Sequence, residues 1–118
     1  MKRIPRWGTA KTARIAHLND LARTAMGVGG SRVVQTPGIA ALPARLQSTI
    51  RERVETFDDF TPANDPYGER DLGLFEIDDI RVIWKIDYYD RALDMHSEDE
   101  SDPSQTVRVL TIMLASEY

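Results

Sequence analysis

Acidic side chains are concentrated in one irregular stretch of the sequence, residues 58–71, where they are the groups best suited to chemistry. Two carboxyl groups, here Glu69 and Asp71, can act as general acid and base when their surroundings separate their pKa values. Several converging carboxylates can instead hold Mg²⁺ or Ca²⁺. The spacing does not match an EF-hand, so a solvated acidic loop is the simpler interpretation. The acidic residues are Asp58, Asp59, Asp65, Glu69 and Asp71.

A second group of polar residues follows in the segment 81–89, which alternates between apolar and polar positions. Lys85 and Asp87 are two residues apart and therefore project from one face of a strand, where Glu76 and Arg108 of neighbouring strands could pair with them. This face is either a wet, salt-bridged surface or a polar floor beneath the loop, with tyrosines at its rim. The candidate binding residues are Asp58, Asp59, Asn64, Asp65, Tyr67, Glu69, Asp71, Lys85, Asp87 and Tyr89.

Other kinds of chemistry lack the residues that they need. The absence of cysteine excludes thiolate catalysis, disulfides and cysteine-based zinc sites. His17 and His96 are the only histidines, and we expect His17 to be a solvated helix residue. The glycine-rich run 27–30 follows a predicted helix, so it fits a helix stop better than a phosphate cradle. We therefore assign no catalytic residue, no metal ligand and no cofactor.

Charge is distributed very unevenly along the 118 residues, although the net charge is only −4. Residues 1–54 carry ten basic and two acidic side chains, whereas residues 55–102 carry four basic and sixteen acidic ones. Either the two halves face each other and partly neutralise, or the acidic half forms a surface for a protein partner. Nucleic acid is not an expected partner, because phosphate binding needs a positive footprint and the pI is about 5.1.

Size and hydropathy predict one soluble domain. A chain of this length, with 42% apolar residues, can bury a core without covalent staples. No apolar run approaches the roughly 20 residues of a membrane span, and the first residues do not lead into a signal-peptide core. We therefore expect a cytoplasmic protein without membrane contact, and we leave its oligomeric state open.

The patterning of the chain predicts an α+β fold, with two helices packed on a three- to four-stranded, mainly antiparallel sheet. Residues 1–8 form a basic, flexible lead-in, and residues 9–118 form a single domain. We expect Phe60 and Tyr67 to anchor the acidic loop by burying their rings. The predicted elements are a helix over 9–26 with Ile15, Leu18, Leu21, Ala22 and Ala25 on its apolar face, a strand over 31–35, a helix over 42–57, a hairpin of 74–77 with 80–89, an acidic loop over 90–105 and a central strand over 106–114.

Four segments of the sequence carry a resemblance to a known family. They read Phe57-Asp58-Asp59-Phe60-Thr61, Asn64-Asp65-Pro66-Tyr67-Gly68-Glu69, Trp84-Lys85-Ile86-Asp87-Tyr88-Tyr89-Asp90 and Val109-Leu110-Thr111-Ile112-Met113-Leu114-Ala115. From about Ile15 to Tyr118 the chain resembles the bacterial family called domain of unknown function 3768. The resemblance implies a small cytoplasmic protein of the kind often carried on plasmids and other mobile DNA.

The resemblance transfers no catalytic role, and the chain departs from the family pattern at one position. Arg70 stands where the family usually has histidine. If that histidine were a catalytic base or a ligand in the family, this chain would lack that group.

Three hypotheses for function follow. The first is a non-enzymatic binding protein that presents its acidic loops to a protein partner, such as an inhibitor of host nucleic-acid-processing machinery carried on mobile DNA. The second is a small metal-assisted hydrolase or nuclease that uses the 58–71 loop together with Lys85 and Asp87. The third is a toxin-like fold of the RelE and ParE kind. This hypothesis rests on the predicted architecture alone, and a shared fold is weak evidence for a shared function.

Overall fold

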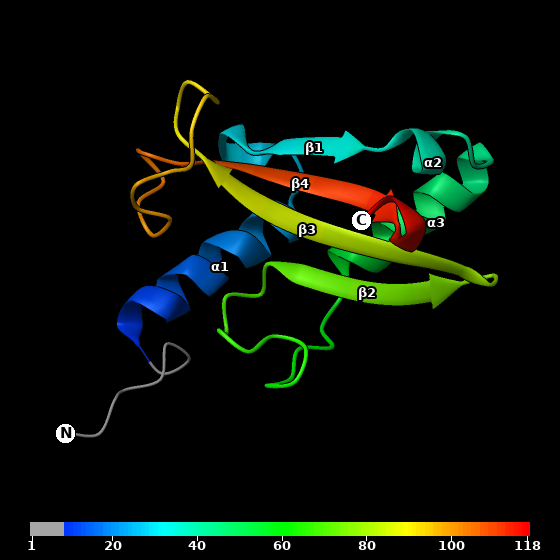
Figure 1. The fold of residues 1–118 in the computed structure, drawn as a ribbon, viewed down its shortest axis with the longest axis horizontal. Coiled ribbons are helices and arrows are strands. Elements are labelled where there is room, and N and C mark those ends of the chain that lie inside the picture. Colours follow the sequence, from blue (N-terminus) through cyan, green and yellow to red (C-terminus); the bar gives the residue numbers. More distant parts are fainter. Residues whose placement is uncertain (1–8) are drawn as a thin grey trace.

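The computed structural model describes residues 9–118, so the predicted lead-in, residues 1–8, lies outside the described residues. Within that range the chain forms one sheet in the order β1-β4-β3-β2 (Figure 1). Strands β2, β3 and β4 pair antiparallel, and β1 pairs parallel with β4. The predicted α+β class and mainly antiparallel sheet are therefore confirmed. The strands are β1 Arg32–Gln35, β2 Leu72–Ile77, β3 Ile80–Tyr89 and β4 Val107–Leu114.

The helices agree with the sequence pattern except around Pro43. In α1, Ala10–Thr24, the hydroxyl of Thr9 accepts a hydrogen bond from the amide of Thr12 at 3.0 Å and so caps the start of the helix. The predicted helix 42–57 is present as α3, Ala44–Glu55, with Pro43 as its N-cap, and a short helix that was not predicted, α2, Pro37–Ala40, precedes it. Two short 3₁₀ helices complete the chain, η2 at Val28–Gly30 and η3 at Ala115–Glu117.

The hairpin between β2 and β3 has the predicted two-residue turn. Asp78 and Asp79 both adopt positive φ angles, 49° and 66°, and the flanking Ile77 and Ile80 are paired. Two consecutive left-handed residues give a turn whose twist matches that of the strands, and aspartate tolerates this conformation better than most residues. The turn fixes the register that places alternate residues of β3 on the core.

The core lies between one face of the sheet and the helices α1 and α3 (Figure 1). Val82, Trp84, Ile86 and Tyr88 alternate along β3 and are buried, and Trp84 is completely buried. Ile15 of α1 and Ile50 and Val54 of α3 are fully buried on the same side, as are Leu110 and Ile112 of β4. Burying this many large apolar side chains supplies most of the driving force for folding.

The buried face of α1 is more polar than its predicted apolar face. Asn19 and Arg23 are buried beside Ile15, whereas Leu21 is 50% exposed. The prediction that Leu21 lies on the buried face was wrong because it rested on hydropathy alone. Hydropathy places a leucine inside and an asparagine outside. Here Asn19 is buried because its side chain meets hydrogen-bond partners on the sheet.

Arg108 lies on the opposite face of the sheet from the one expected. The register pairs Arg108 with Tyr88, so its side chain is on the helix-covered face and only 6% exposed. The predicted pairing of Arg108 with Lys85 or Asp87 is therefore wrong, because those two residues alternate onto the other face. Glu76 is opposite Arg81 across the β2–β3 pair and shares that other face.

Candidate functional site

The loop between α3 and β2 is fastened to the sheet by aromatic rings near its start. The rings of Phe57 and Phe60 meet edge to face at 5.1 Å, and they contact Trp84 at 5.5 Å and 6.1 Å respectively. The guanidinium of Arg23 lies over both Phe60 and Trp84, at 5.2 Å and 5.3 Å. Phe60 thus anchors the loop as predicted, and cation–π contacts add to this attachment.

The middle of the loop is exposed and stabilises its own turn. The side-chain oxygen of Asn64 accepts from the amide of Thr61 at 2.8 Å, and its side-chain nitrogen donates to the carbonyl of Asp59 at the same distance. Asp58 and Asp59 are exposed, and the ring of Tyr67 is 60% exposed. The expected burial of Tyr67 is therefore wrong, because its neighbours Asp65 and Glu69 occupy the inward-facing positions instead.

Asp65 and Glu69 are buried, with exposed fractions of 4% and 5%, which contradicts the expectation of a uniformly solvated acidic loop. One carboxylate oxygen of Asp65 accepts from the backbone amide of Arg70 at 3.1 Å. Oε1 of Glu69 accepts from the hydroxyl of Tyr88 at 3.2 Å. Hydrogen bonds offset the cost of burying these polar groups. Both residues are therefore internal supports of the loop.

A buried hydrogen-bond network joins α1 to the loop and to two strands. The side-chain nitrogen of Asn19 donates to the Tyr88 hydroxyl at 2.7 Å and to the Glu69 carbonyl at 2.9 Å. Nε of Arg108 donates to the side-chain oxygen of Asn19 at 2.7 Å, and the guanidinium lies 5.2 Å from the centre of the Tyr88 ring. We call Asn19, Glu69, Tyr88 and Arg108 the buried polar network.

Three of the candidate residues come together at the end of β3. Asp71, Asp87 and Tyr89 line a cavity of about 300 Å³, and Ile86, Tyr88 and His96 complete its wall. We call this space the Asp71 cavity. The edge of the His96 ring faces the ring of Tyr88, with centroids 6.2 Å apart. The cavity therefore combines carboxylates with aromatic walls, the combination expected for a site that receives a cation.

The carboxyl group of Asp71 has a strongly perturbed acidity. Burial raises its pKa to about 6, and the nearby charge of Glu69 adds to the effect. Nζ of Lys85 forms an ion pair with Oδ2 of Asp87 at 2.8 Å, and this hydrogen-bonded contact raises the pKa of Lys85. Within residues 9–118, neither lysine nor arginine forms an ion pair with Asp71. Perturbed acid groups in a cavity are typical of functional sites.

Asp58 and Asp59 belong to a different region. They line a cavity of about 320 Å³ between the end of α3 and β2, together with Arg53, Leu74 and Glu76. Six of the ten candidate residues are thus divided among the Asp71 cavity, the buried polar network and this second surface. The other four lie outside these groups: Asn64, Asp65 and Tyr67 in the loop itself, and Lys85 beside Asp87 on β3. Arg70, where the resemblance implied a histidine, reaches Asp20 of α1 at 3.0 Å and lies over Phe60.

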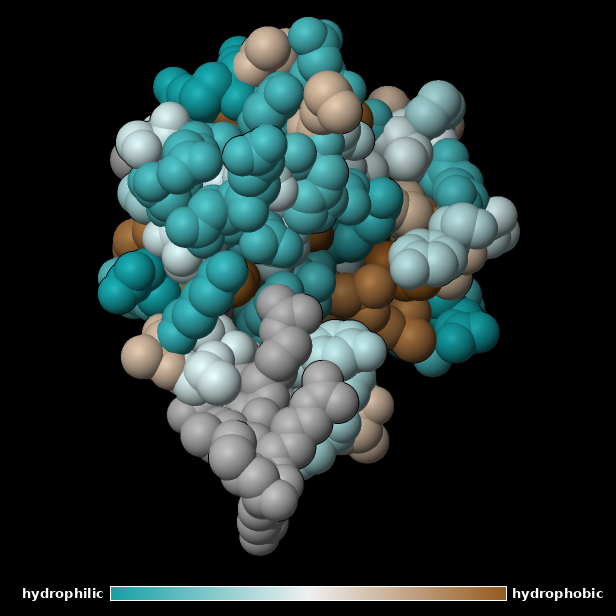
Figure 2. Space-filling view, turned by 60° about the vertical axis from the view of Figure 1, so that its left-hand side comes forward, coloured by the Kyte–Doolittle hydropathy of each residue, from teal (hydrophilic) through white to brown (hydrophobic). Residues whose placement is uncertain are grey.

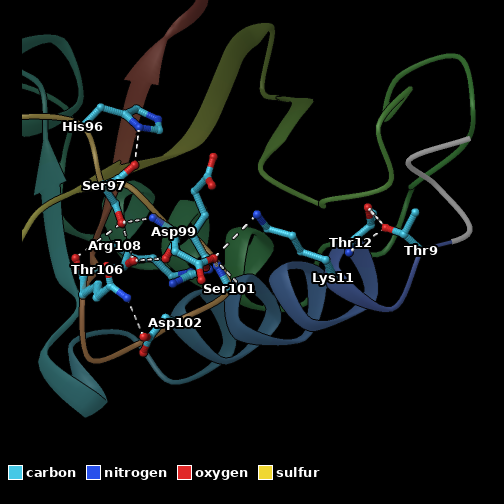
Figure 3. A network of polar contacts seen from close by, with 12 residues as sticks. Thr9, Lys11, Thr12, His96, Ser97, Asp99, Ser101, Asp102, Thr106 and Arg108 are labelled. Carbon is cyan, nitrogen blue, oxygen red and sulfur yellow. Dashed lines mark hydrogen bonds and ion pairs between the residues drawn. The ribbon is translucent and has the colours of Figure 1, made fainter.

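The second acidic loop, residues 90–106, is ordered by its own side chains (Figure 3). Oδ1 of Asp99 accepts from the hydroxyl of Ser101 at 2.6 Å and from its amide at 3.0 Å, and these bonds lower the pKa of Asp99. The hydroxyl of Thr106 donates to the Asp99 carbonyl at 2.8 Å, and Lys11 of α1 is 3.7 Å from the same carboxylate. The two oppositely charged halves of the chain therefore meet here, though only in part.

Sequence reasoning missed four residues of the site: Asn19, Tyr88, His96 and Arg108. A signal for Asn19 was present, because it is four residues after Ile15 and three before Ala22, on one helical face. Across residues 9–118, no three His, Asp or Glu side chains are arranged to hold a metal ion. In the same range, no helix has the length and apolarity that crossing a membrane requires.

Comparison with known proteins identifies the family of the chain. No curated protein and no solved structure matches it. A family model with the description "Protein of unknown function (DUF3768)" matches residues 35–117. The match begins later than the expected resemblance, after α1 and nearly all of β1, but it contains the 58–71 loop, the Asp71 cavity and strands β2 to β4. Because it covers more than half of the sequence, the chain belongs to the DUF3768 family.

Proposed function

We propose that this protein is a non-enzymatic binding protein whose acidic surface receives a basic segment of a protein partner, with the Asp71 cavity as the main contact. The observation that carries the proposal is the recessed carboxyl group of Asp71, which no lysine or arginine of residues 9–118 neutralises. A carboxylate partly removed from water gains more from a cationic partner than one on an open surface.

The surroundings of Asp71 favour a lysine or arginine side chain as the group that enters. Glu69 and Asp65 are close enough to raise the pKa of Asp71 through their negative charge. An incoming cation would be attracted by the same charges. Tyr88 and Tyr89 offer ring surfaces, which suit a guanidinium or ammonium group. The cavity, at about 300 Å³, is large enough for one such side chain.

The rest of this end of the molecule suits a basic partner as well. Asp94 and Glu98 of the second acidic loop are exposed. Asp90 and Glu98 line a shallow cavity on the other side of His96. Figure 2, which brings this end forward, shows a largely hydrophilic surface over its upper part. Clustered carboxylates raise association rates with basic proteins and could occupy sites that bind the phosphate groups of nucleic acids. This is the chemistry by which an accessory protein of mobile DNA would inhibit a nucleic-acid-processing machine.

The test is a titration of the protein with a short peptide of lysine, arginine and glycine, followed by amide chemical shifts. We expect shifts at Asp71, Asp87, Tyr89 and His96, and at least tenfold weaker binding to the double variant Asp71→Asn/Asp87→Asn. The matched control is Asp58→Asn/Asp59→Asn, which removes the same charge from the second surface. Asp65 and Glu69 are unsuitable targets because they support the fold.

Two results would contradict the proposal. One is equal binding of the peptide by the Asp71 double variant and its control, which would show that only total charge matters. The other is equal binding of a peptide in which norleucine replaces lysine and citrulline replaces arginine, because the proposal requires a cation. A contact that depends on the cavity should also weaken as salt is added, since the Debye length falls to about 3 Å at 1 M.

The alternative functions have less support. A metal-assisted hydrolase would need converging ligands, and the part of the chain described contains no such group. A toxin of the RelE and ParE kind would need free basic residues on its C-terminal strands. Here Lys85 is paired with Asp87 and Arg108 is buried in the polar network, so Arg81 is the one exposed basic residue of β3 and β4 that forms no ion pair within residues 9–118.

A further inference from the structure

A second cavity, distinct from the acidic one, lies between α1, η2 and the segment that leads into β4. Its volume is about 250 Å³. One wall is a continuous apolar face of α1, formed by Leu18, Leu21, Ala22 and Ala25. The opposite wall includes Pro103 and Arg108. We call this space the Arg108 cavity.

Its apolar wall is incompletely covered by the rest of the protein. Leu21 is 50% exposed, and Leu18 and Ala25 are half-buried; they lie beside the helix face that packs on the sheet. Large apolar side chains left open inside a concavity favour the binding of an apolar group. Arg108 is the only charged residue among the described residues that line the space.

Arg108 is a buried cation whose direct partners are all uncharged. Nε donates to the side-chain oxygen of Asn19, and Nη2 donates to the backbone carbonyl of Glu100. Among residues 9–118, no carboxylate forms an ion pair with it. Burial lowers its pKa, as expected for a cation partly removed from water. A buried charge of this kind is strongly stabilised by an anion that reaches it.

One nitrogen of the guanidinium is available to such an anion. Nη1 of Arg108 donates to no acceptor in the described part of the protein. Nη1 is also not fully enclosed. In the described part of the protein, the fully enclosed side-chain nitrogen and oxygen atoms that have no hydrogen-bond partner are Nε of Arg23 and Nε1 of Trp84. Nη1 is therefore in contact with accessible space, and the Arg108 cavity is the space that this residue lines.

We propose that the Arg108 cavity binds a small organic carboxylate, whose anionic group meets the Arg108 guanidinium and whose apolar body packs on α1. Arginine forms strong, charge-assisted hydrogen bonds with carboxylates. At roughly 30 Å³ for each small group, the volume admits a ligand of about eight non-hydrogen atoms. Hexanoate has this size and chemistry. The site is separate from the Asp71 cavity and does not rest on the proposed function.

The experiment is a titration of the full chain with hexanoate, followed by amide and methyl chemical shifts. We expect shifts at Leu18, Leu21, Ala25 and Arg108, with a dissociation constant on the order of 1 mM or tighter, as befits so small a ligand. Hexanamide has the same shape without the charge and should bind at least tenfold more weakly. Inorganic phosphate carries charge without an apolar body and should likewise bind at least tenfold more weakly.

Two variants locate the site without removing its buried arginine. Leu21→Asp places a negative charge at the cavity wall and should weaken hexanoate binding at least tenfold. The matched control is Leu74→Asp, at a leucine that is 44% exposed on β2, which should leave the affinity unchanged. Arg108→Lys, used only if its thermal unfolding stays cooperative, should also weaken binding. Shifts outside the cavity, equal binding of hexanamide or phosphate, an unaffected Leu21→Asp variant, or no binding at all would each overturn the proposal.

Discussion

Replacing Asp71 with asparagine should stabilise the protein, and by an amount that depends on pH. The pKa of Asp71 in the folded protein is about 6, above its ordinary value of 3.8, mainly because of burial. Between these values the folded protein keeps a proton that the unfolded chain has lost, so stability falls as pH rises and the loss is complete above about pH 6. At 1.36 kcal/mol per pKa unit the full cost is about 3 kcal/mol. Because the side chain is only half-buried, solvent screening reduces this cost to about 1–2 kcal/mol.

The measurement is urea unfolding of the wild type and Asp71→Asn at several pH values. The variant should be about 1–2 kcal/mol more stable near pH 8. Its stability should approach that of the wild type below about pH 3, where the Asp71 carboxyl group is protonated in both the folded and the unfolded protein. Asp59→Asn, at an exposed carboxylate, controls for the loss of one negative charge. A stability difference that does not change with pH, or a variant less stable than the wild type at pH 8, would refute the argument that burial of Asp71 destabilises the fold.

Two further substitutions test the packing and the buried polar network. Gly73→Ala would press a methyl group against Nε1 of Trp84 and place it 2.8 Å from Cζ of Phe57. The substitution should therefore cost about 1–3 kcal/mol of stability in urea unfolding, and an unchanged midpoint would disprove this tight contact. Tyr88→Phe removes the hydroxyl that joins Asn19 to Glu69 and should lower the free energy of unfolding by about 1–3 kcal/mol. Tyr89→Phe, at a partly exposed ring, should change it by less than about 0.5 kcal/mol. Equal effects of the two substitutions would contradict the network.

The sheet could be predicted from the sequence because its periodicity is local. Alternation of apolar and polar residues along 81–89 predicted the strand β3, and the two residues between 74–77 and 80–89 predicted a tight turn. The strand 106–114 was placed in the centre of the sheet because it is apolar on both faces, and β4 does lie between β1 and β3. The same property hid the orientation of Arg108, since neither face of that strand is distinguished by polar residues.

The arrangement of the candidate site could be predicted only in part, because it depends on contacts between distant segments. Asp71, Asp87 and Tyr89 were selected by type and position, and they do share a cavity. The burial of Glu69 depends on Tyr88 and on Asn19, which is 50 residues away in the sequence. No local pattern distinguishes a carboxylate that meets such partners from one that faces water. Hydrophobic periodicity likewise treated α1 as an ordinary amphipathic helix, although its buried face carries hydrogen-bonding groups.

The buried polar network gives the two cavities a common wall. Tyr88 lines the Asp71 cavity, and Arg108, whose guanidinium lies over the Tyr88 ring at 5.2 Å, lines the cavity beside α1. A negative group, Glu69, bonds to the hydroxyl of that tyrosine, and Asn19 bonds to both Tyr88 and Arg108. A cation near Asp71 and an anion near Arg108 would therefore act on one set of hydrogen bonds. Any effect of one ligand on the affinity of the other must be equal in both directions, because binding free energies are linked. The network thus explains how Glu69 and Arg108, which carry opposite charges, are both buried in a small domain. Two uncharged side chains, those of Tyr88 and Asn19, contact both of these residues.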